Sequence, residues 1–201
     1  MKKILISFMI CFMLVGITAC GNRTVKKDIE VRFENSMFLG DSITEGFAIN
    51  EILPRESVLA GAGATAGFIY EDIDKLVEQK PENIFIMLGS IDILMPVADP
   101  KELFRSDLTK LINKIKDELP DSNIYLQSIT PVTEEALEQE HRYDRIEEYN
   151  KVLKRLTDEL SVSYVDVGIL AQKNPALYAE DGIHFKKEFY LLWLEKLSEL
   201  M

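Results

Sequence analysis

Ser42 is the residue of this sequence best placed to act as a nucleophile. It stands in FLGDSITEG (38–46), where an apolar run stops at Gly40 and is followed by Asp41 and Ser42. A serine at the start of a helix that follows a strand lies beside the N-terminal N–H groups, which favour a developing negative charge. The same serine could instead cap the helix, with Glu45 at the spacing of a capping box. The local sequence fits both roles.

The candidate general base is one of the two histidines. His184 lies in EDGIHF, three residues after Asp181, and Gly182 between them allows a tight turn. In such a turn the carboxylate can hold the Nδ1–H of the imidazole and fix its tautomer. An exposed surface turn would have the same spacing. His141 lies in the charged stretch EQEHRYD, so we expect it to be exposed to solvent.

The N-terminal residues indicate export rather than part of the fold. Two lysines precede ILISFMICFMLVGITA, an apolar stretch shorter than the ~20 residues that cross a bilayer. The stretch ends in ITAC, which resembles the lipobox of bacterial lipoproteins, whose cysteine is acylated. An uncleaved anchor helix is the alternative. We therefore expect a lipoprotein signal peptide at 1–19 and lipid attachment at Cys20. A tether at 20–35 would hold a domain at 36–201 on the extracytoplasmic face of a bacterial cell membrane.

Length and composition favour one globular domain, since the chain has 201 residues and is 47% hydrophobic. Its only cysteines are Cys11, in the apolar stretch, and Cys20, which excludes a disulfide or a thiol nucleophile in the domain. Removing residues 1–19 changes the net charge from −11 to −13, which argues against nucleic acid as a partner. The sequence has no metal-ligand cluster and no phosphate-binding glycine loop, so we expect no metal and no cofactor. It does not indicate an oligomeric state.

Strand and helix patterns alternate along the rest of the chain. Apolar runs predict a strand that ends at Gly40 and further strands at 57–61, 83–89, 123–129 and 163–167. Helical spacing of apolar residues predicts helices at 67–79, 100–119, 144–160 and 185–200, and the longest loop covers about 131–143. This alternation predicts a three-layer α/β/α domain with a mostly parallel sheet of about five strands. Ligands of such sheets bind at the carboxyl ends of the strands, where Ser42 lies.

Taken together, these motifs resemble those of the SGNH (GDSL-type) hydrolase family. Its first block, Gly-Asp-Ser, is matched by Gly40-Asp41-Ser42, and its fifth, Asp-x-x-His, by Asp181-Gly182-Ile183-His184. The glycine of its second block aligns with Gly63 in AGAGAT. The order of the blocks and the alternation of strands and helices agree over residues 37–200. The resemblance implies a flavodoxin-like fold and an ester hydrolase that uses a serine nucleophile and no cofactor.

The resemblance also implies a role for each matched residue. Ser42 would attack an acyl carbonyl, and His184 would accept the serine proton while Asp181 orients the imidazole. The backbone N–H groups of Ser42 and Gly63 would form the oxyanion hole. The supporting residues or substrate contacts that we expect in and beside the first and third blocks are Asp41, Ser90 and Asp92.

The third block departs from the family pattern, which is usually Gly-x-Asn-Asp. Here it reads Gly-Ser-Ile-Asp at 89–92, so Ile91 replaces the asparagine that would donate to the oxyanion. Losing one such donor costs ~3–4 kcal/mol of transition-state stabilisation. The two backbone amides can suffice, Ser90 or Gln127 can replace the donor, or the protein has lost catalysis. The first two outcomes favour an esterase for short-chain or acetyl esters of carbohydrates or other small molecules. The third predicts a non-enzymatic binding protein at the cell surface.

Overall fold

The computed structural model describes residues 28, 29 and 31–201 of the chain. The chain divides into one unit at Met1–Glu34 and a second at Asn35–Met201. The predicted signal peptide, the predicted lipid attachment at Cys20 and most of the predicted tether lie outside the described residues. None of the helices in the described part of the chain is both long and apolar enough to cross a lipid bilayer.

A parallel sheet of five strands forms the centre of the second unit, in the order β2-β1-β3-β4-β5. The strands are β1 (Ser36–Gly40), β2 (Val58–Ala60), β3 (Asn83–Met87), β4 (Asn123–Gln127) and β5 (Ser163–Val165). In the register, Gly40 lies between Ala60 on β2 and Met87 on β3, so three strands end at the same level. The predicted α/β fold with about five strands is confirmed, and every pair in the sheet is parallel.

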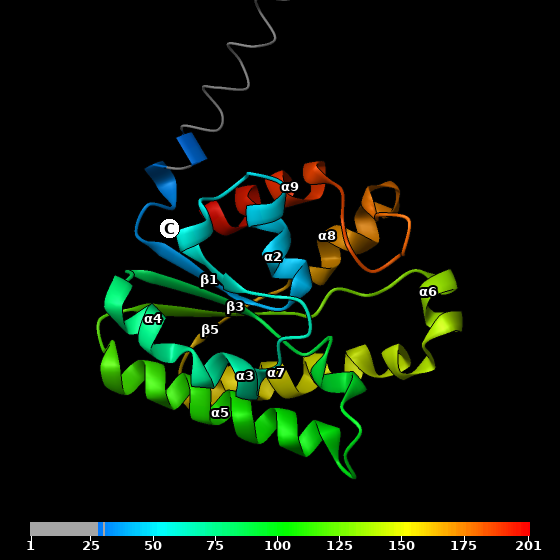
Figure 1. The fold of residues 1–201 in the computed structure, drawn as a ribbon, viewed down its shortest axis with the longest axis horizontal. Helices are drawn as coiled ribbons and strands as arrows, with labels where there is room; N and C mark the ends of the chain where they lie inside the picture. Colours follow the sequence, from blue (N-terminus) through cyan, green and yellow to red (C-terminus); the bar gives the residue numbers. More distant parts are fainter. Residues whose placement is uncertain (1–27, 30) are drawn as a thin grey trace, which may run out of the picture. The chain divides into compact units, whose positions relative to one another are not determined.

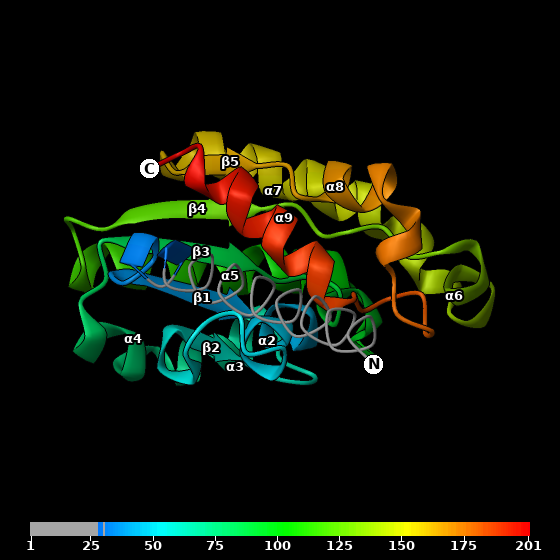
Figure 2. The ribbon, with the colours of Figure 1, turned by 90° about the horizontal axis from the view of Figure 1, so that it is seen from above.

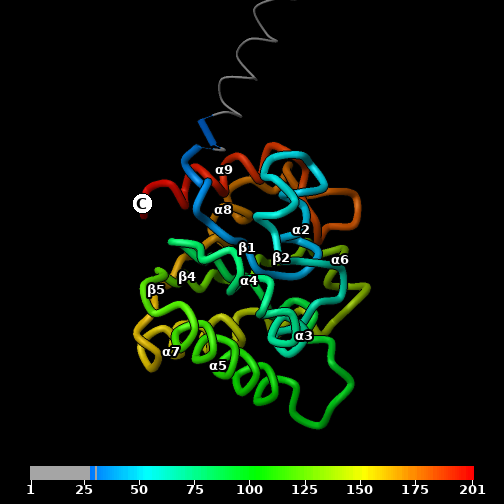
Figure 3. Tube along the Cα trace, turned by 60° about the vertical axis from the view of Figure 1, so that its left-hand side comes forward, coloured from blue at the N-terminus to red at the C-terminus, as the bar shows by residue number. Residues whose placement is uncertain are grey.

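Helices cover both faces of this sheet (Figure 1). One face carries α2 (Ser42–Ile49), α8 (Gly168–Lys173) and α9 (Lys187–Ser198). The opposite face carries α3 (Ala66–Glu71), α4 (Ile73–Gln79), α5 (Pro100–Glu118) and α7 (Ile146–Leu160). Figure 2 shows α9 running across the strands, and Figure 3 shows α5 and α7 side by side. The shorter helices are η1 (Arg55–Ser57), η2 (Asp92–Leu94), α6 (Glu134–Gln139), η3 (His141–Arg145) and η4 (Pro175–Leu177).

The two faces of the sheet bury different kinds of side chain, because successive residues of a strand point to opposite sides. On β1, Met37 and Leu39 belong to the aliphatic core shared with α3, α5 and α7. Phe38 between them stacks on Phe85 of β3, with 5.0 Å between ring centroids. On that aromatic side, α2 and α9 contribute further rings. The core therefore fixes α2 and α9 against the strand that ends at Gly40.

The sequence pattern misplaced two features of the helices. The predicted helix at 67–79 is two helices, because the N–H of Asp72 bonds to Ile69 O and closes α3 with a tight turn before α4 begins. The predicted loop at about 131–143 is largely helical, since it contains α6 and most of η3. Thr133 caps α6 by accepting the N–H of Ala136. Threonine is a common N-cap residue, so its place before this segment is a feature of the sequence that could have predicted the helix.

Candidate active site

The turn after β1 divides two roles between adjacent residues. Asp41 caps α2, since its Oδ1 accepts the N–H of Ile43 at 3.0 Å, and Ser42 is the first residue of the helix. A Cβ at Gly40 would lie 2.5 Å from Met87 O, so only glycine allows β1 and β3 to approach so closely here. The capping role that the sequence left open for Ser42 therefore belongs to Asp41.

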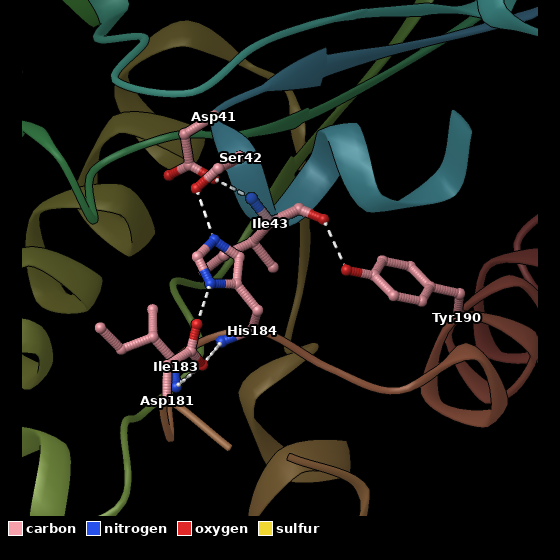
Figure 4. Close-up of polar contacts among 7 residues, drawn as sticks. All are labelled: Asp41, Ser42, Ile43, Asp181, Ile183, His184 and Tyr190. Carbon is pink, nitrogen blue, oxygen red and sulfur yellow. Dashed lines mark hydrogen bonds and ion pairs between the residues drawn. The ribbon is translucent and has the colours of Figure 1, made fainter. Parts of the chain in front are cut away.

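Ser42, His184 and Asp181 form a continuous series of hydrogen bonds (Figure 4). The imidazole Nδ1 lies 2.6 Å from Asp181 Oδ2, and Nε2 lies 2.8 Å from Ser42 Oγ. An ionised carboxylate can only accept, so Nδ1–H is the donor to Asp181. In the neutral imidazole, Nε2 is then the nitrogen without a proton, and it can accept a hydrogen bond from the hydroxyl of Ser42. This is the arrangement that a general base needs beside a serine nucleophile.

The turn that carries His184 is shaped by the second oxygen of Asp181. Asp181 Oδ1 accepts the N–H groups of Ile183 and His184, each at 2.9 Å, while Oδ2 accepts the imidazole. Gly182 has φ +68°, a conformation that residues with a side chain rarely adopt. Burial by itself would raise the pKa of Asp181, but the hydrogen bonds from His184 and Ile183 outweigh it and lower the pKa. The carboxylate is therefore ionised where it must orient the imidazole.

A segment distant in sequence holds this turn in place. The N–H of Thr133 donates to Gly182 O at 2.9 Å, and Tyr178 Oη donates to Pro131 O at 2.6 Å. The turn is also closed by Ala179 N–H, which donates to His184 O at 2.8 Å. These contacts from the β4–α6 loop could not be predicted from the sequence, since no local pattern pairs these positions.

Gly63 lies in the loop between β2 and α3. It is exposed and has φ +78°, which accounts for glycine at this position. The loop is closed by Ala64 N–H, which donates to Gly61 O at 3.1 Å, and α3 begins with Thr65 as its cap. Because β2 pairs with β1, this loop leaves the sheet at the same edge as Ser42. It is thus positioned to offer a backbone N–H on that edge.

The two side chains that were predicted to replace the missing donor have other partners. The hydroxyl of Ser90 donates to Asp41 Oδ2, and both residues are buried. Gln127 is fully buried, and its Oε1 accepts Trp193 Nε1–H at 2.6 Å, while its Nε2 is buried and has no partner among the described residues. The prediction that Gln127 could donate to a substrate is wrong, because the side chain lies within the core beneath α9. Ile91 itself is partly exposed.

The three expected supporting residues lie behind the surface rather than on it. Asp41, Ser90 and Asp92 are 1%, 5% and 4% exposed, so their side chains are not presented at the surface, where a substrate would bind. Burial raises the pKa of Asp41, although hydrogen bonds from Ser90 and Ile43 and the nearby His184 lower it. Burial likewise raises the pKa of Asp92 to about 7. Asp41, which directly precedes Ser42, and Asp92 in the third block are therefore two buried carboxyl groups with raised pKa values.

Other parts of the described chain do not add to the site. His141 is exposed, as expected from its charged neighbours. No cluster of histidine, cysteine, aspartate or glutamate in the described residues could hold a metal ion. A cavity of about 440 Å³ lies between the β4–α6 loop, α7 and α8, and its lining includes Pro131, Asn150 and Tyr164 but not the three hydrogen-bonded residues. We assign this cavity no part in the chemistry.

Comparison with known proteins identifies the family. The model of the GDSL-like lipase/acylhydrolase family matches residues 38–192. The chain belongs to this family. The resemblance drawn from the Gly-Asp-Ser and Asp-x-x-His blocks is thereby confirmed, and the matched range contains Ser42, Gly63, Asp181 and His184.

Solved structures of GDSL-family and esterase proteins share the fold. The chain is similar to a GDSL-like lipase from Bacteroides thetaiotaomicron (17% identity, 82% of this chain and 86% of that chain, TM-score 0.67). It is also similar to the lipase/acylhydrolase from Enterococcus faecalis (18%, 82% and 94%, TM-score 0.66). A third is an acetyl xylan esterase (15%, 83% and 98%, TM-score 0.64). A comparison with curated protein sequences found no match.

Proposed function

We propose that this GDSL-family hydrolase is a serine esterase that removes short acyl groups, above all acetyl groups, from carbohydrates. One observation carries the proposal: the hydrogen bonds that run from Asp181 through His184 to Ser42 at the carboxyl edge of the sheet. The three residues stand in the family's first and fifth blocks. A serine with an oriented imidazole beside it is the usual means of acyl transfer.

The reaction proceeds through an acyl-enzyme. Ser42 Oγ attacks the acyl carbonyl carbon while its proton passes to His184 Nε2. The resulting imidazolium is stabilised by Asp181, and its proton then goes to the oxygen of the leaving alcohol as the ester bond breaks. A water molecule, deprotonated by the same nitrogen, attacks the acyl-enzyme and releases the acid and Ser42.

The oxyanion hole of this proposal consists of backbone N–H groups. Those of Ser42, at the N-terminus of α2, and of Gly63 would face the carbonyl oxygen as it becomes negative. Ile91 adds no donor. A hole of two donors is expected to be ~10²–10³ slower than one with a third, so the enzyme should turn over slowly.

The choice of short acyl groups rests on the loops around Ser42. The β2–α3 loop consists of residues 61–65 and carries no apolar insertion that could cover a long chain. The acetyl xylan esterase among the similar structures is, by its name, an enzyme for acetylated carbohydrate. We extend that substrate class to this chain. Acylation of Cys20, the last residue of the lipobox-like ITAC, would hold the enzyme at the outer face of a bacterial membrane.

Labelling with a fluorophosphonate probe tests the nucleophile. We expect the wild-type protein to be labelled and Ser42→Ala to be unlabelled, since the probe reacts only with an activated serine. Ser163→Ala, which alters an exposed serine on β5, is the matched control and should be labelled normally. A series of p-nitrophenyl esters should give the highest kcat/KM for acetate. An unlabelled wild-type protein would contradict the proposal.

A binding protein without catalysis is the second candidate, and the observation that favours it is Ile91 in the third block. If this candidate is correct, the fluorophosphonate probe labels neither the wild-type protein nor Ser42→Ala. Binding of acetylated oligosaccharides by calorimetry, without their hydrolysis, would then support the second candidate.

A further inference from the structure

A buried carboxyl group lies behind the loop that carries Gly63. Asp92 Oδ1 accepts the N–H of Ala66 at 3.2 Å, and Ala66 is the first residue of α3. This hydrogen bond links the third block to the second block across 26 positions of sequence. Asp92 Oδ2 is buried too, and it has no hydrogen-bond partner among the described residues. One oxygen thus anchors the loop while the other lies unpaired in the interior.

The groups that face Asp92 favour its neutral form. Its pKa is raised to about 7, mainly by burial and in smaller part by the negative charges of Asp41 and Asp107, while the N–H of Ala66 lowers it. Tyr149 on α7 is within electrostatic reach, and its own hydroxyl is buried without a partner in the described part of the chain. An ionised carboxylate with one hydrogen bond would be costly in such surroundings.

We propose that Asp92 is a positioning residue that, in its protonated form, holds the Gly63 loop through the N–H of Ala66. Loss of its proton would place a negative charge behind the oxyanion hole, where it opposes the charge that develops on the substrate oxygen. Asp92 would therefore slow hydrolysis at alkaline pH even though it does not touch the substrate. The catalytic part of this inference rests on the proposed esterase function.

Two substitutions separate the hydrogen bond from the charge. Asp92→Asn keeps an oxygen that can accept the N–H of Ala66, has nearly the same shape and cannot ionise. Asp92→Leu removes the acceptor and the charge while keeping an apolar side chain of similar volume in the interior. Asp117→Asn removes an exposed carboxylate on α5 and is the matched control.

Activity against p-nitrophenyl acetate as a function of pH is the first measurement. We expect the ratio of kcat for Asp92→Asn to kcat for wild type to rise at least about threefold between about pH 6 and pH 9, as wild-type Asp92 ionises. At about pH 6, where wild-type Asp92 is protonated, Asp92→Leu should lower kcat about tenfold with little change in KM, because the loop loses its anchor. A ratio that stays constant with pH, or full activity in Asp92→Leu, would overturn the inference.

Thermal unfolding gives a second measurement that needs no substrate. The pKa of Asp92 is about 7 in the folded protein and 3.8 in its ordinary state, so the folded protein holds the proton more tightly. This contribution to stability is complete below about pH 4 and is lost as the pH rises to about 7. We therefore expect the difference between the Tm of Asp92→Asn and that of wild type to increase as the pH rises from about 4 to about 7. The difference between the Tm of Asp117→Asn and that of wild type should stay constant over the same range.

The two measurements fail in different ways. If no variant hydrolyses any ester but the Tm difference depends on pH as expected, the esterase proposal fails and Asp92 is still neutral in the folded protein. If the esters are hydrolysed but neither the kcat ratio nor the Tm difference changes with pH, the inference about Asp92 is wrong.

Discussion

At the scale of residues, the nucleophile depends on its neighbour. Asp41 takes over the helix cap, and Ser90 satisfies the second oxygen of Asp41. This leaves the hydroxyl of Ser42 directed at His184 (Figure 4). If Ser42 were the cap, its oxygen would accept a backbone N–H of α2. The Gly-Asp-Ser order therefore has a physical reason: the aspartate caps the helix and the serine remains available for chemistry.

Ile91 allows the cost of a missing donor to be measured. We expect Ile91→Asn to raise kcat for p-nitrophenyl acetate by about 10²- to 10³-fold with little change in KM, because the new amide would stabilise only the transition state. Ile91→Val keeps the apolar character of the position and should show no gain. Steady-state kinetics of the three proteins check this prediction, and an unchanged kcat in Ile91→Asn would show that the donor is not needed.

At the scale of elements, α2 is held from behind by α9. Tyr190 Oη donates to Ile43 O at 3.1 Å, and Phe47 packs against Trp193 with 4.7 Å between ring centroids (Figure 4 shows Tyr190 and Ile43). The chain immediately before α9 carries His184. Since Ser42 begins α2, the two helices position both members of the hydrogen-bonded pair Ser42 and His184.

Gly46 on α2 lies directly against the side chain of Tyr190 on α9. A Cβ there would lie 1.8 Å from Tyr190 Oη, so Gly46→Ala must push α9 away from α2. We expect a loss of about 1–3 kcal/mol in the free energy of unfolding. Gly61→Ala is the control, because no described atom lies within 4 Å of a Cβ there, and it should change stability by less than about 0.5 kcal/mol. Urea denaturation measures both, and equal stability of the two variants would contradict the prediction.

At the scale of the whole molecule, the parallel sheet brings the site together. Ser42 and His184 are 142 positions apart in sequence, and they meet at the edge where β1, an interior strand between β2 and β3, ends together with its neighbours. The third block follows β3, which pairs with β1, and so it reaches the same edge. The loop that follows β4, the next strand in the sheet after β3, contacts the turn of His184 through the N–H of Thr133, which donates to Gly182 O.

The proposed location concerns the whole chain and is tested on intact cells. We expect wild-type protein produced in a bacterium to incorporate an alkyne-tagged fatty acid and to be recovered with the membrane fraction. Cys20→Ala should incorporate no label, while Cys11→Ala is the control and should be labelled as wild type. Label that persists in Cys20→Ala would exclude acylation at this cysteine.

The sequence by itself determined the fold class, the family and the residues of the hydrogen-bonded series. Apolar runs and helical spacing are local properties, so they predicted the alternation of strands and helices. Gly40 and Gly182 also carried local information, since each stands where the backbone excludes a side chain. The roles of Ser42, His184 and Asp181 could be proposed because the two motifs that contain them, Gly-Asp-Ser and Asp-x-x-His, are each short and contiguous in the sequence.

Only the tertiary structure decided how the supporting groups pair. Asp41 rather than Ser42 caps the helix, Gln127 lies in the core beneath Trp193, and Asp92 reaches Ala66 on a different loop. Each of these outcomes depends on which strands are neighbours and on how the helices pack over them. Such hydrogen bonds join positions that are distant in sequence, and a local pattern contains no information about a partner that only the packing of the chain brings near.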